Sequence, residues 1–186
     1  MNLILDEVND ITPNGFLIRD DFRESIRFEL LMQDNTIDEK TKIALALNLY
    51  YPQMPNDIEK AIEDMLWFYR CGKEIKTSHK KEENNNAKQI YSYEFDDELI
   101  YSAFMYQYKI DINSIEYLHW WKFKAMFEGL NKENKIVEIM GYRAIDLSKI
   151  KDKEEKKRYK KLKQIYSLPD MRTQEQKEQD FAMAFL

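Results

Sequence analysis

Glycine, proline and cysteine are scarce in this chain. Among its 186 residues there are four glycines, four prolines and one cysteine, Cys71. Sandwiches and barrels of short strands need a turn signal about every ten residues, so the low glycine and proline content argues against both folds. A single cysteine excludes a disulfide framework within the chain and fits a reducing compartment. So few glycines also make a phosphate-binding loop hard to build, and no GxSxG, HExxH or CxxC pattern occurs.

Long apolar runs are missing as well. The first residues, MNLILDEVND, carry no basic side chain ahead of their short apolar run, unlike a secretory signal peptide. No uncharged apolar run approaches the ~20 residues that a transmembrane helix needs. The sequence therefore predicts a soluble cytoplasmic protein that does not enter a membrane.

Aromatic and charged residues, by contrast, are abundant. The chain contains 12 Tyr, 10 Phe and 3 Trp, and its 29 basic and 34 acidic side chains give a net charge of −5. Disordered chains lack such aromatic content, so most of the sequence is expected to fold. The charges are unevenly spread: residues 1–64 hold six basic and fourteen acidic side chains, whereas residues 146–166 hold nine basic and four acidic ones.

Apolar residues recur at helical spacing along most of the chain. Phe22, Ile26 and Leu30, for example, follow one another at four-residue intervals. The pattern predicts a mainly α fold, a single compact domain of six to seven helices. Their approximate ranges are 20–31, 36–50, 56–72, 96–108, 113–129, 135–145 and 149–163.

Local signals mark several of these helix starts. Capping-box patterns predict N-caps at three places: Thr36 with Glu39, Asn56 with Glu59, and Asn113 with Glu116. Ahead of the first helix, Pro13 to Gly15 is a turn signal between two short apolar stretches, 3–5 and 16–18. The sequence therefore leaves room for a short N-terminal β-hairpin packed against the helices.

One internal segment departs from the helical pattern. Residues 73–89 are polar and hold a single large apolar side chain, Ile75. Ordering them would cost roughly 1–2 kcal/mol per residue with little apolar burial in return. We therefore expect a long mobile loop within a helical domain that spans residues 1–169.

Residues 170–186 are expected to form a polar tail that ends in the apolar cluster FAMAFL. Phe181 and Phe185 lie four residues apart, so one helical turn would align them, with Leu186 beside them. We expect this cluster to dock on its own domain, on a neighbouring subunit or on a partner. A frayed end with accidental hydrophobicity is the alternative.

Two features could carry chemistry, and both have a plainer explanation. The acids between Glu94 and Glu98 could hold a divalent cation, with His119 as a further ligand, in a metal-dependent enzyme. Their spacing matches no calcium-loop pattern, and acids at a helix start complement the helix dipole. His119 in LHWWKF fits a hydrogen-bonded histidine at the edge of an aromatic core. We therefore assign no catalytic, cofactor-binding or metal-ligating residue and expect no enzyme.

The basic stretch 149–163 raises the question of nucleic-acid binding. Glu154 and Glu155 interrupt it, and the neighbouring lysines are spaced for ion pairs with them within one helix. The negative net charge of the chain would also oppose binding to a phosphate backbone. A solvated charged helix is the simplest interpretation. Docking to an acidic surface and a small helical nucleic-acid-binding regulator that uses 149–163 are the alternatives.

Several stretches, taken in order, closely resemble the bacteriophage gene-product-fifteen family of siphophages and prophages of Gram-positive hosts. They are NGFLIRDDFRESIRFELL, EKTKIALALNLYYPQMPNDIEKAIEDMLWFYRCG, YSYEFDDELIYSAFMYQYKIDINSIEYLHWWKFKAMFEGL and KIVEIMGYRAIDLSKIKDKE. The resemblance covers about residues 1–169 and rests most on WFYRCG and LHWWKF. The tail lies outside it.

The resemblance implies a non-enzymatic tail assembly chaperone that binds the tape-measure protein during tail morphogenesis. Such a factor would act in the host bacterial cytoplasm and be absent from the mature virion. Helical spacing places the tryptophans of LHWWKF in the core first and at an interface second. The candidate partner-binding residues are Trp120, Trp121, Phe181, Phe185 and Leu186. A homo-oligomer is left open, and nucleic acid is disfavoured as a partner.

Overall fold

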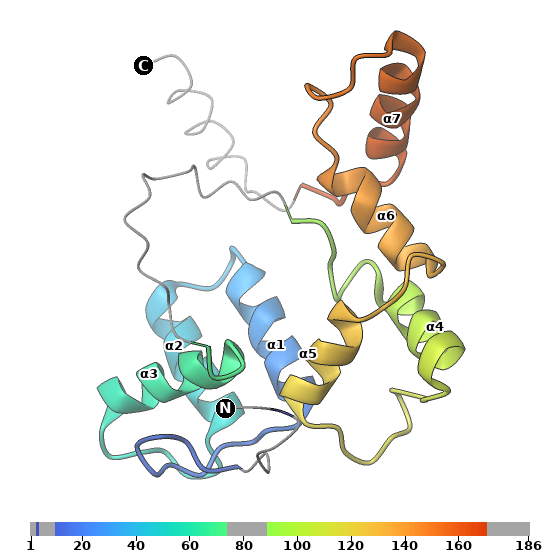
Figure 1. Cartoon of the computed structure of the whole chain (residues 1–186). Coiled ribbons are helices and arrows are strands. Elements are labelled where there is room, and N and C mark those ends of the chain that lie inside the picture. Colours follow the sequence, from blue (N-terminus) through green and yellow to red (C-terminus); the bar gives the residue numbers. More distant parts are fainter. Residues whose placement is uncertain (1–2, 4–9, 74–88, 171–186) are drawn as a thin grey trace, which may run out of the picture.

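The structure, a computed structural model, describes residue 3, residues 10–73 and residues 89–170 (Figure 1). These residues form seven helices and almost no strand. The helices are α1 (Phe22–Gln33), α2 (Glu39–Tyr50), α3 (Ile58–Tyr69), α4 (Asp97–Tyr108), α5 (Trp120–Glu128), α6 (Lys135–Ala144) and α7 (Lys153–Ile165). The predicted compact, mainly α fold is confirmed. None of these seven helices is both long and apolar enough to cross a bilayer.

Four helices begin after an aspartate whose carboxylate accepts a hydrogen bond from a backbone N–H two or three residues further on. These N-cap residues are Asp21, Asp38, Asp57 and Asp152. The caps predicted at Thr36 and Asn56 are therefore wrong by one or two residues, because an aspartate stands closer to each helix. Thr36 instead donates its N–H and its hydroxyl to Asp34, at 2.8 and 2.6 Å.

Helix α5 begins later than predicted, at Trp120 rather than near Asn113. Asp111 accepts the backbone N–H of Asn113 at 3.0 Å, which holds this part of the chain in a turn. The chain that follows then pairs with the start of α1. Leu118 O accepts the N–H of Phe22 at 2.9 Å, and the N–H of Trp120 donates to Asp20 O at 2.8 Å. These backbone contacts, distant in sequence, override the local capping box.

The predicted N-terminal hairpin is reduced, in the described residues, to one antiparallel bridge between Ile11 and Leu17. The turn between them has Gly15 at φ +84°, a conformation that glycine adopts without strain. Asp64 of α3 holds this turn in place. Its buried carboxylate accepts the Thr12 hydroxyl and both the N–H (3.0 Å) and the Nδ2 (2.8 Å) of Asn14. The predicted first strand, 3–5, lies mostly outside the described residues.

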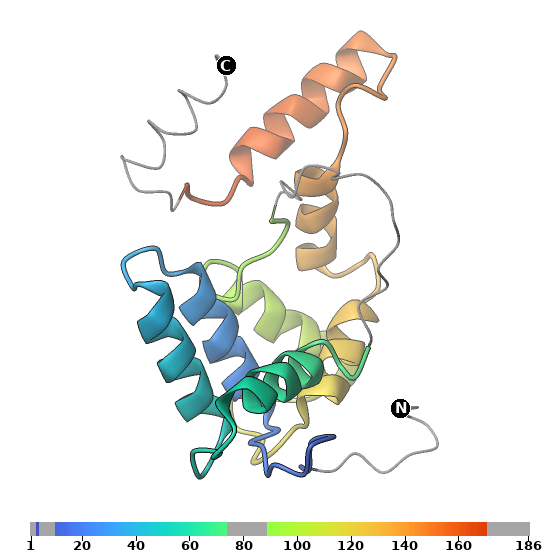
Figure 2. The same ribbon diagram turned by 90° about the vertical axis from the view of Figure 1, so that its left-hand side faces the viewer.

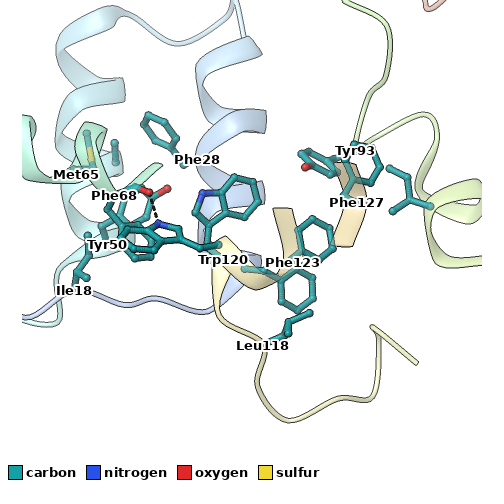
Figure 3. Packing of buried hydrophobic residues seen from close by; sticks show 14 of the residues in the cluster. Ile18, Phe28, Tyr50, Met65, Phe68, Tyr93, Leu118, Trp120, Phe123 and Phe127 are labelled. Atoms are coloured by element: carbon teal, nitrogen blue, oxygen red, sulfur yellow. Dashed lines mark hydrogen bonds between the residues drawn. The ribbon is translucent and has the colours of Figure 1, made fainter. Parts of the chain in front are cut away.

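The core is aromatic and is centred on α5. Phe123 is fully buried and stacks on Phe22 of α1 (ring centroids 4.6 Å apart) and on Phe104 of α4 (5.0 Å). Figure 3 shows Trp120 between a group that contains Phe68 and Tyr50 and a second group with Phe123 and Tyr93. Helix α5 therefore joins the α1–α3 part of the molecule to α4 (Figure 1). Stacked rings of this kind contribute about 0.5–1.5 kcal/mol each beyond their burial.

A buried ion pair connects the C-terminal helices to α4. The guanidinium of Arg143, on α6, makes two hydrogen bonds to the carboxylate of Asp96, which precedes α4, at 2.6 and 2.9 Å. Arg143 also donates to the carbonyls of Ile90 (3.1 Å) and Tyr166 (2.6 Å). One side chain thus fastens α6, the start of α4 and the end of α7. Figure 2 shows α6 and α7, in orange, at one end of the molecule.

Candidate protein-binding surface

The two tryptophans of LHWWKF are core residues. Trp120 and Trp121 are 0% and 3% exposed. Each indole N–H donates to a backbone carbonyl of α3, Trp120 to Tyr69 O at 2.9 Å and Trp121 to Phe68 O at 2.7 Å. Buried polar groups satisfied in this way are typical of a structural role. Neither indole is therefore available for direct contact with a partner in this conformation, in contrast to their proposed interface role.

The other candidate partner-binding residues, Phe181, Phe185 and Leu186, lie outside the described residues. Most of the predicted mobile loop, residues 74–88, does so too. Both expectations stay predictions.

His119 caps α5 and lies in the core. It is 1% exposed, its Nδ1 accepts the N–H of Trp121 at 3.0 Å, and its ring meets Phe68 edge-on. Burial lowers the pKa of His119 to about 4, so the ring is neutral at physiological pH. With Nδ1 as the acceptor, the ring proton lies on Nε2, which has no hydrogen-bond partner; the nearest carboxylate oxygen is Asp20 Oδ2 at 3.7 Å. The environment suits a helix cap.

The acidic residues 94–98 do not act as a set. Asp96 is buried and bonded to Arg143, whereas Glu94, Asp97 and Glu98 are exposed. In the parts of the chain that the structure describes, no three His, Cys, Asp or Glu side chains come close enough to hold a metal ion. The metal-centred alternative, which combined these acids with His119, therefore has no geometric support there.

Helix α4 carries an exposed apolar face. Ile100, Ala103 and Phe104 point into the core. On the outside, the α4 face consists of Tyr101, Met105 and Tyr106, which are 37%, 39% and 61% exposed. The outer face of an amphipathic helix is ordinarily polar. Single exposed apolar residues are common, but several on one face mark an interaction surface.

A groove of about 530 Å³ lies beside this face, between the first turn of α4, the start of α1 and the loop at 112–113. We call it the α4 groove. Phe22, Tyr101 and Ile112 give it apolar walls. An apolar side chain that projects from a partner could fill it, with the α4 face extending the contact.

The free charges of the α4 groove are negative. Arg23 reaches it, but its guanidinium is already bonded to Asp21 at 3.1 Å and to the carbonyl of Ile115 at 2.5 Å. Asp97 and Glu98 line the groove without an ion pair among the described residues. The groove therefore suits an apolar segment flanked by Lys or Arg.

Sequence reasoning did not identify the α4 face. It predicted a helix over 96–108 from apolar spacing and assigned no role to its outer side. A signal was present, because Tyr101, Met105 and Tyr106 occupy positions where a solvated helix face would carry charged side chains. The groove could not be found in this way, since its walls come from segments about 80 residues apart in the sequence.

Helix α7 has no buried residue and packs mainly on α6. The ion pairs predicted within it do not form: in this described helix no lysine lies within ion-pair distance of Glu154 or Glu155. Lys163 instead donates to the carbonyl of Ile145 at 2.6 Å. The helix is solvated and charged, and its other lysines have no ion-pair partner among the described residues.

Comparisons with known proteins identify one family. A family model described as "Bacteriophage Gp15 protein" matches residues 4–168, nearly the whole described part of the chain. No curated protein and no solved structure matches.

Proposed function

The chain belongs to the bacteriophage Gp15 protein family, and from this premise we propose that it is a tail assembly chaperone that binds the tape-measure protein. It would act without catalysis, in the cytoplasm of the host bacterium, and leave the tail before the virion is complete. The observation that best supports a binding role is the exposed α4 face next to the α4 groove.

The shape and charge of this surface suit one helix of the partner. An amphipathic helix that lies on α4 would place anchors at positions i, i+4 and i+7 along Tyr101 and Met105 and into the groove. Lysine or arginine residues beside these anchors would meet Asp97 and Glu98. Covering such apolar stripes on a long helical protein would prevent their premature association.

A charge placed on the α4 face tests this proposal. The double variant Met105→Glu and Tyr106→Glu should weaken binding of the tape-measure protein from the same tail gene cluster by more than about tenfold, since central interface residues cost 2 kcal/mol or more when lost. Both side chains are exposed, so the melting temperature should stay near that of the wild type.

Ile43→Glu on α2 is the matched control, because Ile43 is 43% exposed and Met105 is 39% exposed. Combined with Leu45→Glu on the same helix, where Leu45 is 42% exposed, it adds two negative charges, as the test variant does, to similarly exposed apolar residues of another helix. Equal losses of binding in the two variants, or no loss in either, would show that the α4 face is not the binding site.

The availability of the α7 cations favours a second candidate function, nucleic-acid binding through 149–163. Binding to a phosphate backbone must weaken steeply as salt rises, with a slope set by the number of phosphates contacted. A titration of duplex DNA at several salt concentrations, with wild type and with Lys156→Glu/Lys160→Glu, tests it. Absence of salt-dependent binding at low ionic strength would exclude this candidate.

A further inference from the structure

A second concave site, the α5–α6 cleft, shares no lining residue with the α4 groove. It has a volume of about 180 Å³. Its apolar walls are formed by Tyr91, Tyr93, Phe127, Leu130, Val137 and Met140. Lys124 and Glu128 also line it and contribute one charge of each sign, so apolar contact rather than net charge decides what binds there.

The cleft has the size and chemistry of a site for one phenyl ring. An apolar cavity of about 150 Å³ accommodates benzene, and the α5–α6 cleft is slightly larger. Tyr91 and Phe127 already meet edge-on with ring centroids 5.1 Å apart, a geometry that a third ring can extend. Met140 offers a thioether, which packs favourably against aromatic rings.

Tyr166, the residue at which helix α7 ends and after which the C-terminal segment continues, lies near this cleft. We call it the root of the C-terminal segment. Arg143 donates to the carbonyl of Tyr166 at 2.6 Å and to the carbonyl of Ile90 at 3.1 Å. Ile90 directly precedes Tyr91 in the cleft wall, and α6 carries both Arg143 and Met140. One guanidinium group therefore spans the distance between the C-terminal end of α7 and the edge of the cleft.

The chain beyond this root is long enough to reach the cleft. Fifteen residues lead from Ser167 to Phe181, and they span up to about 50 Å if extended and about 20 Å if helical. Helix α6, whose Arg143 bonds to Tyr166 and whose Val137 and Met140 line the cleft, is only ten residues long, or about 15 Å. The same chain can therefore supply the occupant without a second copy.

We propose that a phenylalanine ring of residues 181–186 of the same chain, Phe181 or Phe185, occupies the α5–α6 cleft. These are the aromatic side chains of the FAMAFL segment, and the cleft admits one ring. The tail then acts as an internal ligand that covers apolar surface outside the α4 groove. This inference does not depend on the tape-measure proposal.

Methionine methyl NMR on the full chain tests this proposal. A phenyl ring in the cleft shifts the methyl resonance of Met140 through its ring current, and Met105 on the α4 face serves as an internal control. The two resonances are assigned with Met140→Leu and Met105→Leu. Spectra of Phe181→Ala and of Phe185→Ala are then compared with that of the wild type.

One of the two variants should move the Met140 resonance by more than a linewidth and leave Met105 in place, at every protein concentration. No movement of Met140 in either variant overturns the proposal. Equal movement of Met105 indicates a change across the whole domain and also overturns it. If the Met140 shift disappears on dilution together with a dimer peak in gel filtration, the occupant comes from a second copy and the same-chain proposal is wrong.

Discussion

Replacing Arg143 with methionine removes the side chain that joins α4, α6 and the end of α7. The carboxylate of Asp96, which is 3% exposed, then loses both of its guanidinium bonds and keeps the hydrogen bond from the N–H of Ser92, at 2.9 Å. Methionine keeps most of the apolar stem of arginine, so the change tests the charge rather than the packing. The carbonyls of Ile90 and Tyr166 lose a donor as well.

The expected cost follows from the burial of the pair. Breaking a buried ion pair by removing one partner costs about 3–5 kcal/mol, because the remaining charge is left without compensation. The lost hydrogen bonds to the two carbonyls belong to the same network and are not simply additional. The free energy of unfolding of Arg143→Met should therefore fall by about 3–5 kcal/mol.

Adding Asp96→Asn to this variant should recover a substantial part of the loss. Asparagine still presents an oxygen to the N–H of Ser92 but carries no charge that needs a partner. Replacing both members of a buried pair is often far less costly than removing one. The double variant is thus predicted to be more stable than Arg143→Met alone, which is the opposite of additive behaviour.

Urea unfolding followed by tryptophan fluorescence measures these differences. With a slope of about 2–3 kcal/mol per molar urea, Arg143→Met should shift the midpoint downward by about 1–2 M. A shift that corresponds to less than about 1 kcal/mol would contradict the buried pair. A double variant less stable than Arg143→Met would contradict the role assigned to the unpaired carboxylate.

Three further predictions concern the core. Trp120→Ala should lower the free energy of unfolding by about 3–5 kcal/mol, because it removes a fully buried, hydrogen-bonded indole; a loss below about 1 kcal/mol in thermal or urea unfolding would refute this. Burial raises the pKa of Glu29 above its ordinary 4.5, so the ionised carboxylate opposes folding. Glu29→Gln should therefore melt higher than the wild type at pH 7, and the gain should vanish below pH 4.5; a gain that is the same at all pH values speaks against it. Burial lowers the pKa of His119 to about 4 from 6.5, so only the unfolded chain takes up this proton between those values. The wild type should lose stability as the pH falls from 6.5 to 4. The variant His119→Asn keeps a capping acceptor and should lose less over the same pH range in thermal melts. An equal change of melting temperature with pH in the two proteins would contradict the buried neutral ring.

Much of the fold could be predicted from local pattern. The four-residue spacing of Phe22, Ile26 and Leu30 located α1, and the predicted helix ends agree with the structure to within about four residues except at the start of α5. The start of α5 could not be predicted, since it depends on backbone pairing between Asp20 and Trp120, a hundred residues apart in the sequence. Local capping preference is too weak, at about 1 kcal/mol, to compete with such contacts.

The candidate surface was less accessible to sequence reasoning. The sequence favoured a core position for Trp120 and Trp121 over an interface, and the structure agrees. It gave no sign that Asp96, one acid among several, has a buried partner 47 residues away. The sequence contains the apolar residues of the α4 face. Whether they are exposed, however, depends on which side of α4 packs against the core.

The most direct test of the proposed chaperone function is coexpression with the tape-measure protein from the same tail gene cluster. The proposal predicts that the tape-measure protein becomes soluble and elutes with this chain as one complex, and that the Met105→Glu/Tyr106→Glu variant fails to support either. A tape-measure protein that remains insoluble, or that elutes separately from the wild-type chain, would contradict it.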